Sequence, residues 1–375
     1  MSDRCILCAG ELKNPFSLKN MPSSAQGFTS TPREAVDLSL TMNVFGCEYC
    51  GLVQYVGPLV PYYKEVIRST RLSDTMREFR SNQFSRLVGQ YDIKSVFELG
   101  AGSGEYLDIF KSTEVETFGI EGSLKLATKA RASGHSVYDG FLPETDATRK
   151  IGKKTFDLVT SFNFIEHLPD PLASLRTLVT KLKPGGTAIL EVPNFDMISE
   201  FGLFNEFIPD HRSYFTEDTF KMLLSMAGLE VLSIEPIWEK YILSAVAKKR
   251  EPSEWKLYES VRLSLRTEIG NFFSETPPGQ NAVWSAGHQS LATISNLDIA
   301  KYISCIIDSS PDKQLAYSPA SGLPIVSPDT LMEGKIKRVL LAAAGFNPEI
   351  TRAIKEKYDP GIKLGFLNKG TVEFD

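Results

Sequence analysis

The stretch that decides the fold is Ser95-Val-Phe-Glu-Leu-Gly-Ala-Gly-Ser-Gly104, in which a run typical of a buried strand ends in closely spaced glycines. A helical pattern follows from Glu105 to Lys111. Glycine tolerates positive φ and lets backbone amides approach an anion, which the N-terminus of a helix favours. The stretch therefore predicts a strand, a glycine loop and a helix that hold a nucleotide-like ligand. A dinucleotide fits such a loop as well.

An acidic residue lies at the end of the next predicted strand, in Gly119-Ile-Glu-Gly122. Glu121 thus stands about 20 residues beyond the glycines, where a carboxylate can accept both hydroxyls of an adenosine ribose. The plain alternative is a surface glutamate that happens to follow a strand.

The rest of the chain divides around this region. Short β-rich runs alternate with helical stretches over 95–250, which predicts a parallel-rich sheet with helices on both faces. A second alternation over 277–375 predicts a smaller α/β domain, joined by a helical linker over 251–276. On the other side, 62–94 has a helical pattern typical of a connector, and 1–61 is turn-rich with little core of its own.

The bulk composition excludes several classes of protein. A chain of 375 residues exceeds what one hydrophobic core usually serves, and 42% hydrophobic with 23% charged residues is an ordinary globular balance. The net charge of -5 provides no basic field for nucleic acid. The N-terminus does not resemble a secretory signal, and no apolar run is long enough to span a membrane. We expect a soluble cytoplasmic protein with a small-molecule partner; its oligomeric state is not indicated.

Four of the five cysteines form two Cys-x-x-Cys units, Cys5-Ile-Leu-Cys8 and Cys47-Glu-Tyr-Cys50. Two such units supply the four thiolates of a tetrahedral Zn²⁺ site. A redox pair is the competing interpretation, although such a pair would not need a second one. A four-thiolate site leaves no position for water or substrate, so this metal is expected to fold the segment. Cys305 lies in an apolar run and is expected to be a core residue.

The central region resembles the class I S-adenosylmethionine-dependent methyltransferases, whose fold is a Rossmann-like α/β domain. The resemblance rests on FELGAGSGEYL, GIEGS, FDLVTSFNFIEHLPDP and LKPGGTAILEVPN, in that order, and covers 95–249. It implies a cofactor site in which Glu98, Gly100, Gly102 and Gly104 cradle the methionine part, Glu121 takes the ribose, Asp139 with Gly140 lies near the adenine, and Phe162 with Asn163 faces the methyl group. An aspartate before a glycine is also ordinary turn chemistry.

Nearly the whole chain resembles the nucleotide-sugar C-methyltransferases, through the cysteine pairs, CGLVQ, the central blocks, DHRSYF, and the C-terminal run from AGHQSLATISN to Asp308-Ser-Ser-Pro-Asp-Lys-Gln314. In that family a zinc-binding domain and a C-terminal Rossmann-like domain flank the catalytic domain. A 4-keto deoxysugar nucleotide is methylated at the carbon beside the ketone. The resemblance implies S-adenosylmethionine and Zn²⁺ as cofactors and a nucleotide-linked sugar, or another small-molecule acceptor, as partner.

Carbon methylation needs a base, because a C–H bond beside a ketone is a poor nucleophile until its proton is removed. The resemblance implies His211 as this base, with Asp210 orienting its ring or raising its pKa. Asn163 and His167 match residues that contact the sugar or its enolate. Further candidates for the acceptor pocket are Tyr62, Tyr63, Tyr214 and Asn194.

These candidates also have ordinary interpretations. His167 can hydrogen-bond the loop before Pro169, His211 can be an exposed loop residue, and the two tyrosines can pack between domains. The chain also departs from the family pattern: Ile208 replaces a tyrosine, Asp210 replaces a glutamate, and a Gly-Gly-Ser run is absent near 238–244.

Because the departures lie where the sugar would bind, two other functions stay open. One is oxygen or nitrogen methylation of another nucleotide-linked or small acceptor, and the other is a noncatalytic binding protein that kept the fold. In the C-terminal domain, the turn Ser285-Ala-Gly-His288 and Asp308 at the end of the next strand have the same order as the first site. One glycine is too few for close pyrophosphate approach, so we expect the turn to hold the acceptor's nucleotide or to serve packing alone.

Overall fold

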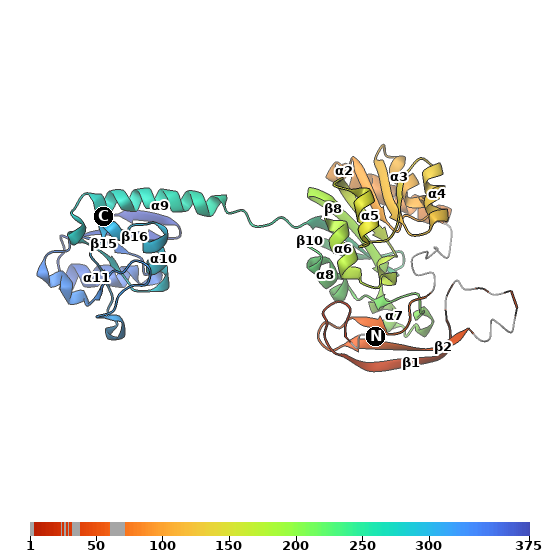
Figure 1. Ribbon diagram of the computed structural model, residues 1–375, viewed down its shortest axis with the longest axis horizontal. Helices are drawn as coiled ribbons and strands as arrows, with labels where there is room; N and C mark the ends of the chain where they lie inside the picture. The colour runs from red at the N-terminus through yellow and green to blue at the C-terminus, as the bar shows by residue number, and fades with distance from the viewer. Residues whose placement is uncertain (1–3, 24, 26–27, 29, 32–37, 61–71) are drawn as a thin grey trace. The chain divides into compact units, whose positions relative to one another are not determined.

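The computed structural model describes residues 4–23, 25, 28, 30–31, 38–60 and 72–375, which form two compact units, 1–251 and 252–375 (Figure 1). Each unit contains a mainly parallel sheet with helices packed on it, so the predicted α/β class is confirmed.

The first unit is built on a seven-stranded sheet with the order β10-β11-β8-β7-β4-β5-β6. Strands from β8 to β6 are parallel, while β11 is antiparallel to both of its neighbours. Strands β4, β5, β7, β8 and β11 are largely buried on both faces, because each contains an apolar run. The strands are β4 (Ser95–Leu99), β5 (Glu116–Glu121), β6 (Ser136–Asp139), β7 (Phe156–Phe162), β8 (Leu182–Pro193), β10 (Leu229–Ile237) and β11 (Ile242–Lys249).

Helices cover both faces of this sheet, as predicted (Figure 1). Neighbouring residues on β4 enter opposite cores: Val96 packs on the side of α2, α3 and α4, and Phe97 on the side of α5, α6 and α8. The helices are α2 (Asp74–Tyr91), α3 (Glu105–Lys111), α4 (Leu124–Ala132), α5 (Thr145–Ile151), α6 (Pro171–Val179), α7 (Phe195–Glu200) and α8 (Glu217–Met226). Phe84 and Leu87 of α2 are buried in the core, so the described part of the expected connector belongs to the domain.

The N-terminal segment forms a four-stranded sheet of order β1-β2-β3-β9, not the coreless, turn-rich segment that the sequence suggested. Alternation along β2 buries Met42 and Val44 against Tyr55 and Tyr214, which gives the sheet a small core. The signal was missed because the outer strand β1 is mostly exposed and the fourth strand comes from far along the chain. The strands are β1 (Leu12–Pro22), β2 (Ser39–Cys47), β3 (Val53–Tyr55) and β9 (Ser213–Tyr214).

The second unit has a six-stranded sheet of order β14-β13-β12-β15-β16-β17, parallel except for β17. Its strands are β12 (Asn281–Trp284), β13 (Cys305–Ile307), β14 (Ile325–Val326), β15 (Arg338–Leu341), β16 (Lys363–Asn368) and β17 (Thr371–Phe374). Its helices are α9 (Lys256–Ser274), α10 (His288–Asn296) and α11 (Asn347–Lys357). The expected linker is mostly α9, and its Ile269 and Phe273 lie in the core, so this helix is part of the unit.

Among the described residues, none of the helices combines the length and the apolar character that crossing a bilayer requires.

Candidate functional site

The glycine loop after β4 has the backbone that its sequence predicts. Gly100, Gly102 and Gly104 have φ values of 78°, 55° and 87°, a region that other residues enter only at a cost. A Cβ on Gly100 would stand 2.6 Å from the Phe164 ring, whereas one on Gly102 would meet no atom within 4 Å. The loop is thus closed on its protein side and has open space at Gly102, which fits a ligand held against the backbone.

Glu121 points back at this loop from the end of β5. Its carboxylate accepts hydrogen bonds of 2.8 Å from the amides of Gly102 and Ser123, and the residue is only 4% exposed. These two backbone amides fix the orientation of the carboxylate. The predicted arrangement of loop and acid is therefore present, and its residues fit the nucleoside part of S-adenosylmethionine.

Asp139 lies beside Glu121 on the neighbouring strand, since the two residues are register partners of β5 and β6. Its carboxylate accepts a 2.6 Å hydrogen bond from Arg131, and the amide of Gly140 donates to the carbonyl of Glu121 at 3.0 Å. Glu98 is 1% exposed within β4. Asp139 and Gly140, the residues expected near the adenine, thus lie next to Glu121.

Phe162 and Asn163, the two residues expected to face the methyl group, lie at the end of β7 in different surroundings. Phe162 turns into the core, with its ring 4.5 Å from that of Tyr106 and 5.4 Å from that of Phe84. Asn163 leaves the strand with φ of 48°, and its Oδ1 is buried without a hydrogen-bond partner. A strained asparagine with an unused buried acceptor is a common feature of a binding site. Asn163 therefore remains a candidate, whereas core packing accounts for the side chain of Phe162.

Two histidines meet next to this strand end. The rings of His167, in the short 3-10 helix η1 (Ile165–His167), and His211 are 4.7 Å apart and nearly perpendicular. Nδ1 of His167 lies 3.0 Å from the carbonyl oxygen of Asp210. Because a carbonyl only accepts, that nitrogen carries a proton and Nε2 is left as an acceptor in the neutral ring. Burial lowers the pKa of both rings, and for His211 the neighbouring His167 lowers it further.

Sequence reasoning missed Glu166, which completes this group. Its carboxyl is 2% exposed, Oε1 lies 3.9 Å from Nε2 of His167, and Oε2 is buried without a hydrogen-bond partner. Burial raises the pKa of Glu166 to about 8. The residue stands in the quoted phrase FNFIEHL, but only the fold shows that this glutamate faces inward.

Asp210 contacts the other histidine of the pair through its backbone. Its carbonyl accepts a hydrogen bond from His167, while its carboxylate accepts from the amide of Ala25 at 2.9 Å. The role of Asp210 toward His211 stays a prediction.

Two of the remaining candidates for the acceptor pocket form hydrogen bonds within the protein. The hydroxyl of Tyr214 both donates to the carbonyl and accepts from the amide of Ile208, each at 3.1 Å. Asn194 caps α7 through Oδ1 and donates to the carbonyl of Lys240 at 2.8 Å. Tyr62 and Tyr63 lie outside the described residues.

The four N-terminal cysteines come together as predicted. Their sulfurs lie within 4.8 Å of one another, with 3.5 Å between Cys5 and Cys50 and between Cys8 and Cys47. Zinc with Zn–S bonds of about 2.3 Å sets tetrahedral sulfurs about 3.8 Å apart. The amide of Gly10 also points at the sulfur of Cys8, at 3.4 Å. The donor set and its spacing fit zinc.

The second unit repeats the loop-and-acid pattern in a weaker form. Asp308 accepts from the amides of Ala286 at 2.7 Å and Ser310 at 2.9 Å, and Ser285 has φ of 108°. Lys313 lies 3.2 Å from the same carboxylate, so a cation of the protein stands beside this acid.

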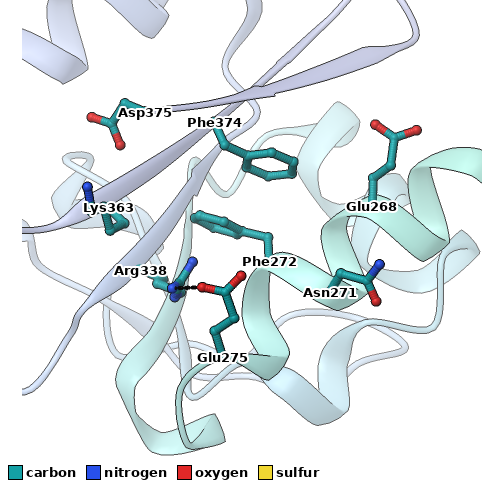
Figure 2. Close-up of a pocket in the computed structure, with 8 residues that line it drawn as sticks. All are labelled: Glu268, Asn271, Phe272, Glu275, Arg338, Lys363, Phe374 and Asp375. Carbon is teal, nitrogen blue, oxygen red and sulfur yellow. Dashed lines mark hydrogen bonds and ion pairs between the residues drawn. The ribbon is translucent and has the colours of Figure 1, made fainter.

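A separate cavity of about 390 Å³ lies between α9 and the strands β15 to β17 (Figure 2). Arg338 pairs with Glu275 there, and the rings of Phe272 and Phe374 stack 4.6 Å apart. Glu268 and Asp375 add further carboxylates. Because the arginine is already neutralised, this cavity is poorly suited to a polyphosphate, and the candidate site is the one in the first unit.

Comparison with known proteins agrees with this assignment. Residues 69–234 match the family model of a methyltransferase domain, and 254–366 match that of the C-methyltransferase C-terminal domain. The first unit is thus similar over 69–234 to a methyltransferase domain, and the second unit is similar over 254–366 to the C-terminal domain of C-methyltransferases.

Individual relatives are distant. C-methyltransferase NovU of Streptomyces niveus is 25% identical over 39% of this chain and 35% of its own length. A ubiquinone biosynthesis O-methyltransferase of Leptothrix cholodnii is 29% identical over 31% of this chain and 51% of its own length. The chain thus spans about a third of the length of the first of these relatives and about half of the second. Among solved structures, a SAM dependent methyltransferase from Archaeoglobus fulgidus is 19% identical, with a TM-score of 0.37 over 46% of this chain and 94% of the other.

Proposed function

We propose that this chain transfers a methyl group from S-adenosylmethionine to a carbon atom beside a ketone of a nucleotide-linked sugar, with His211 as the general base. The observation that carries the proposal is the pair of half-buried histidines beside the end of β7, in a region similar to a methyltransferase domain that is followed by one similar to the C-methyltransferase C-terminal domain. Carbon methylation needs a proton acceptor at this place, and the pair provides one.

The cofactor supplies an electrophilic methyl group on a sulfonium. The protein supplies alignment, since direct transfer between two correctly placed reactants needs little else. Gly102 and Glu121 position the nucleoside, and Asn163 lies where β7 ends, with its Oδ1 buried and without a hydrogen-bond partner. Zn²⁺, held by Cys5, Cys8, Cys47 and Cys50, would fold the N-terminal sheet and take no part in the reaction.

His211 is suited to accept a proton at neutral pH. Burial and the neighbouring His167 lower its pKa, so the ring is neutral above that lowered value. A neutral imidazole can accept the proton of the carbon beside the ketone, and a hydrogen-bond donor at the ketone oxygen stabilises the enolate. The amide of Asn163 is the group proposed for that oxygen.

Oxygen methylation is the second candidate, because the curated relatives include a ubiquinone biosynthesis O-methyltransferase. Ile208 and Asp210 depart from the sugar-enzyme pattern in the loop that carries His211. A noncatalytic binding protein is a third candidate; failure to bind S-adenosylmethionine in calorimetry would favour it.

The test is a reaction of the purified protein with ¹³C-methyl-labelled S-adenosylmethionine and a panel of nucleotide-linked 4-keto sugars in D₂O. The proposal predicts a methyl group bonded to carbon, and solvent deuterium at the carbon beside the ketone even before transfer. His211→Gln loses both, whereas Arg352→Gln, at an exposed residue of α11, retains both. A methyl ether or amine as product, or no product from any sugar despite cofactor binding, would reject the carbon reaction.

A further inference from the structure

Three side chains that can gain or lose a proton lie together behind the end of β7. One oxygen or nitrogen from each of Glu166, His167 and His211 lies within 4.8 Å of the others. Glu166 has no assigned role in the proposed reaction, although its Oε2 is buried without a hydrogen-bond partner. Burying a carboxyl oxygen without a hydrogen-bond partner costs free energy, which indicates that Glu166 has a function other than stabilising the fold.

The tautomer of His167 shows which of its nitrogen atoms faces Glu166. The carbonyl of Asp210 fixes the proton on Nδ1, and Nε2 is the nitrogen that faces Oε1 of Glu166 at 3.9 Å. When this ring or its neighbour His211 gains a proton, a positive charge forms in a buried place. Glu166 is the carboxylate within reach of that charge.

Resting on the proposed function, we propose that Glu166 is a positioning residue whose carboxylate pairs with the imidazolium formed when the histidine pair takes the proton of the acceptor carbon. In this step the C–H bond breaks, an N–H bond forms on His211, and the remaining electron pair passes into the enolate. That pair then forms the new bond to the methyl carbon as the bond from methyl to sulfur breaks. The proton leaves to water after the product is released.

Other ionisable groups surround the carboxyl on several elements. Asp210 belongs to the same loop as His211, and its carboxylate is held by the amide of Ala25. Tyr241, before β11, lies near Glu166 and donates a 2.5 Å hydrogen bond to Glu206. The guanidinium of Arg212 points elsewhere, to the carbonyl of Gly57 at 2.9 Å. The histidine pair is therefore the group with which a charged Glu166 would form an ion pair.

The pairing has a consequence for pH dependence. Burial raises the pKa of Glu166 to about 8, so the carboxylate becomes more populated as pH rises through this value. Only the ionised carboxylate can pair with the imidazolium, and kcat should therefore rise as the pH passes through about 8. In Glu166→Gln the rise disappears, and kcat at pH 8.5 falls by roughly 10- to 100-fold, as expected when a base loses an opposite charge worth one to two pKa units.

The test combines kinetics with NMR titration of the ring nitrogens in the full chain, which needs no acceptor. Glu166→Gln keeps the size of the side chain, Glu166→Asp keeps the charge, and Glu200→Gln in α7 is the matched surface control. We expect the ring nitrogens of His167 to show a chemical-shift inflection near pH 8, where Glu166 ionises beside Nε2. This inflection should disappear in Glu166→Gln, remain in Glu166→Asp and stay unchanged in the control.

Two results would overturn the inference. One is a His167 titration in Glu166→Gln that is identical to wild type. The other is a second bound metal, beyond that of the four thiolates, that disappears in this variant, since the three side chains would then be ligands. An inactive wild type with a shifted His167 titration would instead reject the proposed reaction while leaving the pairing intact.

Discussion

Gln54 of β3 lies opposite Ser213 of β9, so the segment with the cysteine pairs and the loop with His211 are parts of one sheet. The side chain of Gln54 is 2% exposed and accepts a 2.9 Å hydrogen bond from the amide of Ile6, which lies within the first cysteine pair. The metal segment is thus connected through one buried side chain to the strand that follows the proposed base.

This connection predicts that loss of the metal loosens the loop of His211. In Cys47→Ser, or after chelation, hydrogen exchange of the amides over 208–216 should become faster, while exchange in β4 and β7 stays slow. Cys305→Ser, a buried thiol of the second unit, is the control. Unchanged exchange over 208–216 after complete metal removal would show that the loop is held without the N-terminal sheet.

A buried ion pair anchors α2 to the sheet. Arg80 makes two hydrogen bonds of 2.6 and 2.5 Å to Glu191, both side chains have no exposed surface, and Ser244 donates to Glu191 at 2.8 Å. Removing one charge leaves the other unpaired, so Glu191→Gln should lower the free energy of unfolding of the first unit by about 3–5 kcal/mol.

Chemical denaturation measures that loss, and the double variant Arg80→Met with Glu191→Leu serves as the comparison. We expect the double variant to be more stable than Glu191→Gln, because no buried charge is then left alone. Equal losses in the two proteins would argue that packing around α2, rather than the unpaired charge, sets the cost.

Glu166 should also make stability depend on pH. Its pKa is raised from 4.5 to about 8 on folding, so between these values the folded chain holds a proton that the unfolded chain releases. The contribution of Glu166 to stability therefore becomes less favourable as pH rises through this window. Thermal unfolding should show that Glu166→Gln gains stability relative to wild type between pH 5 and pH 8. A difference that stays constant with pH would contradict the raised pKa.

The glycine loop gives a matched pair of variants. Gly100 and Gly185 both have positive φ, but a Cβ strikes the Phe164 ring only at Gly100 and meets nothing within 4 Å at Gly185. Gly100→Ala should weaken S-adenosylmethionine binding at least about tenfold, since moving the ring displaces the loop and costs more than 1 kcal/mol. Gly185→Ala should bind like wild type. Calorimetry that finds the two variants alike would remove the loop from the cofactor site.

The sequence was sufficient to predict those features that depend on neighbouring residues. The strand Ser95–Leu99, the glycine loop after it and the acid at Glu121 follow from neighbouring residues, and the structure has all three. The cysteine pairs were similarly readable, because two Cys-x-x-Cys units are typical of a four-thiolate site. The pairing of β1 with β2 then brings the two units together.

Other features depend on contacts between distant residues. Strand β9 joins the N-terminal sheet across a separation of some 160 residues in the chain, and no local pattern indicates that pairing. The contact between the carbonyl of Asp210 and His167 joins residues 43 positions apart, so no local pattern indicates it. Glu166 was not predicted because the sequence does not show that η1 packs this glutamate inward. The site residues themselves stay predictions until they are tested.

Cofactor binding is the measurement that tests the account most directly. Titration of the purified chain with S-adenosylmethionine in a calorimeter should show one site, and Glu121→Gln should bind about 10- to 100-fold more weakly because hydrogen bonds to a charged acceptor contribute about 1.5–3 kcal/mol. Glu116→Gln, at the other end of β5, should bind like wild type. No heat of binding from the folded wild-type chain, or equal affinity in Glu121→Gln, would contradict the assignment of this loop and acid as the cofactor site.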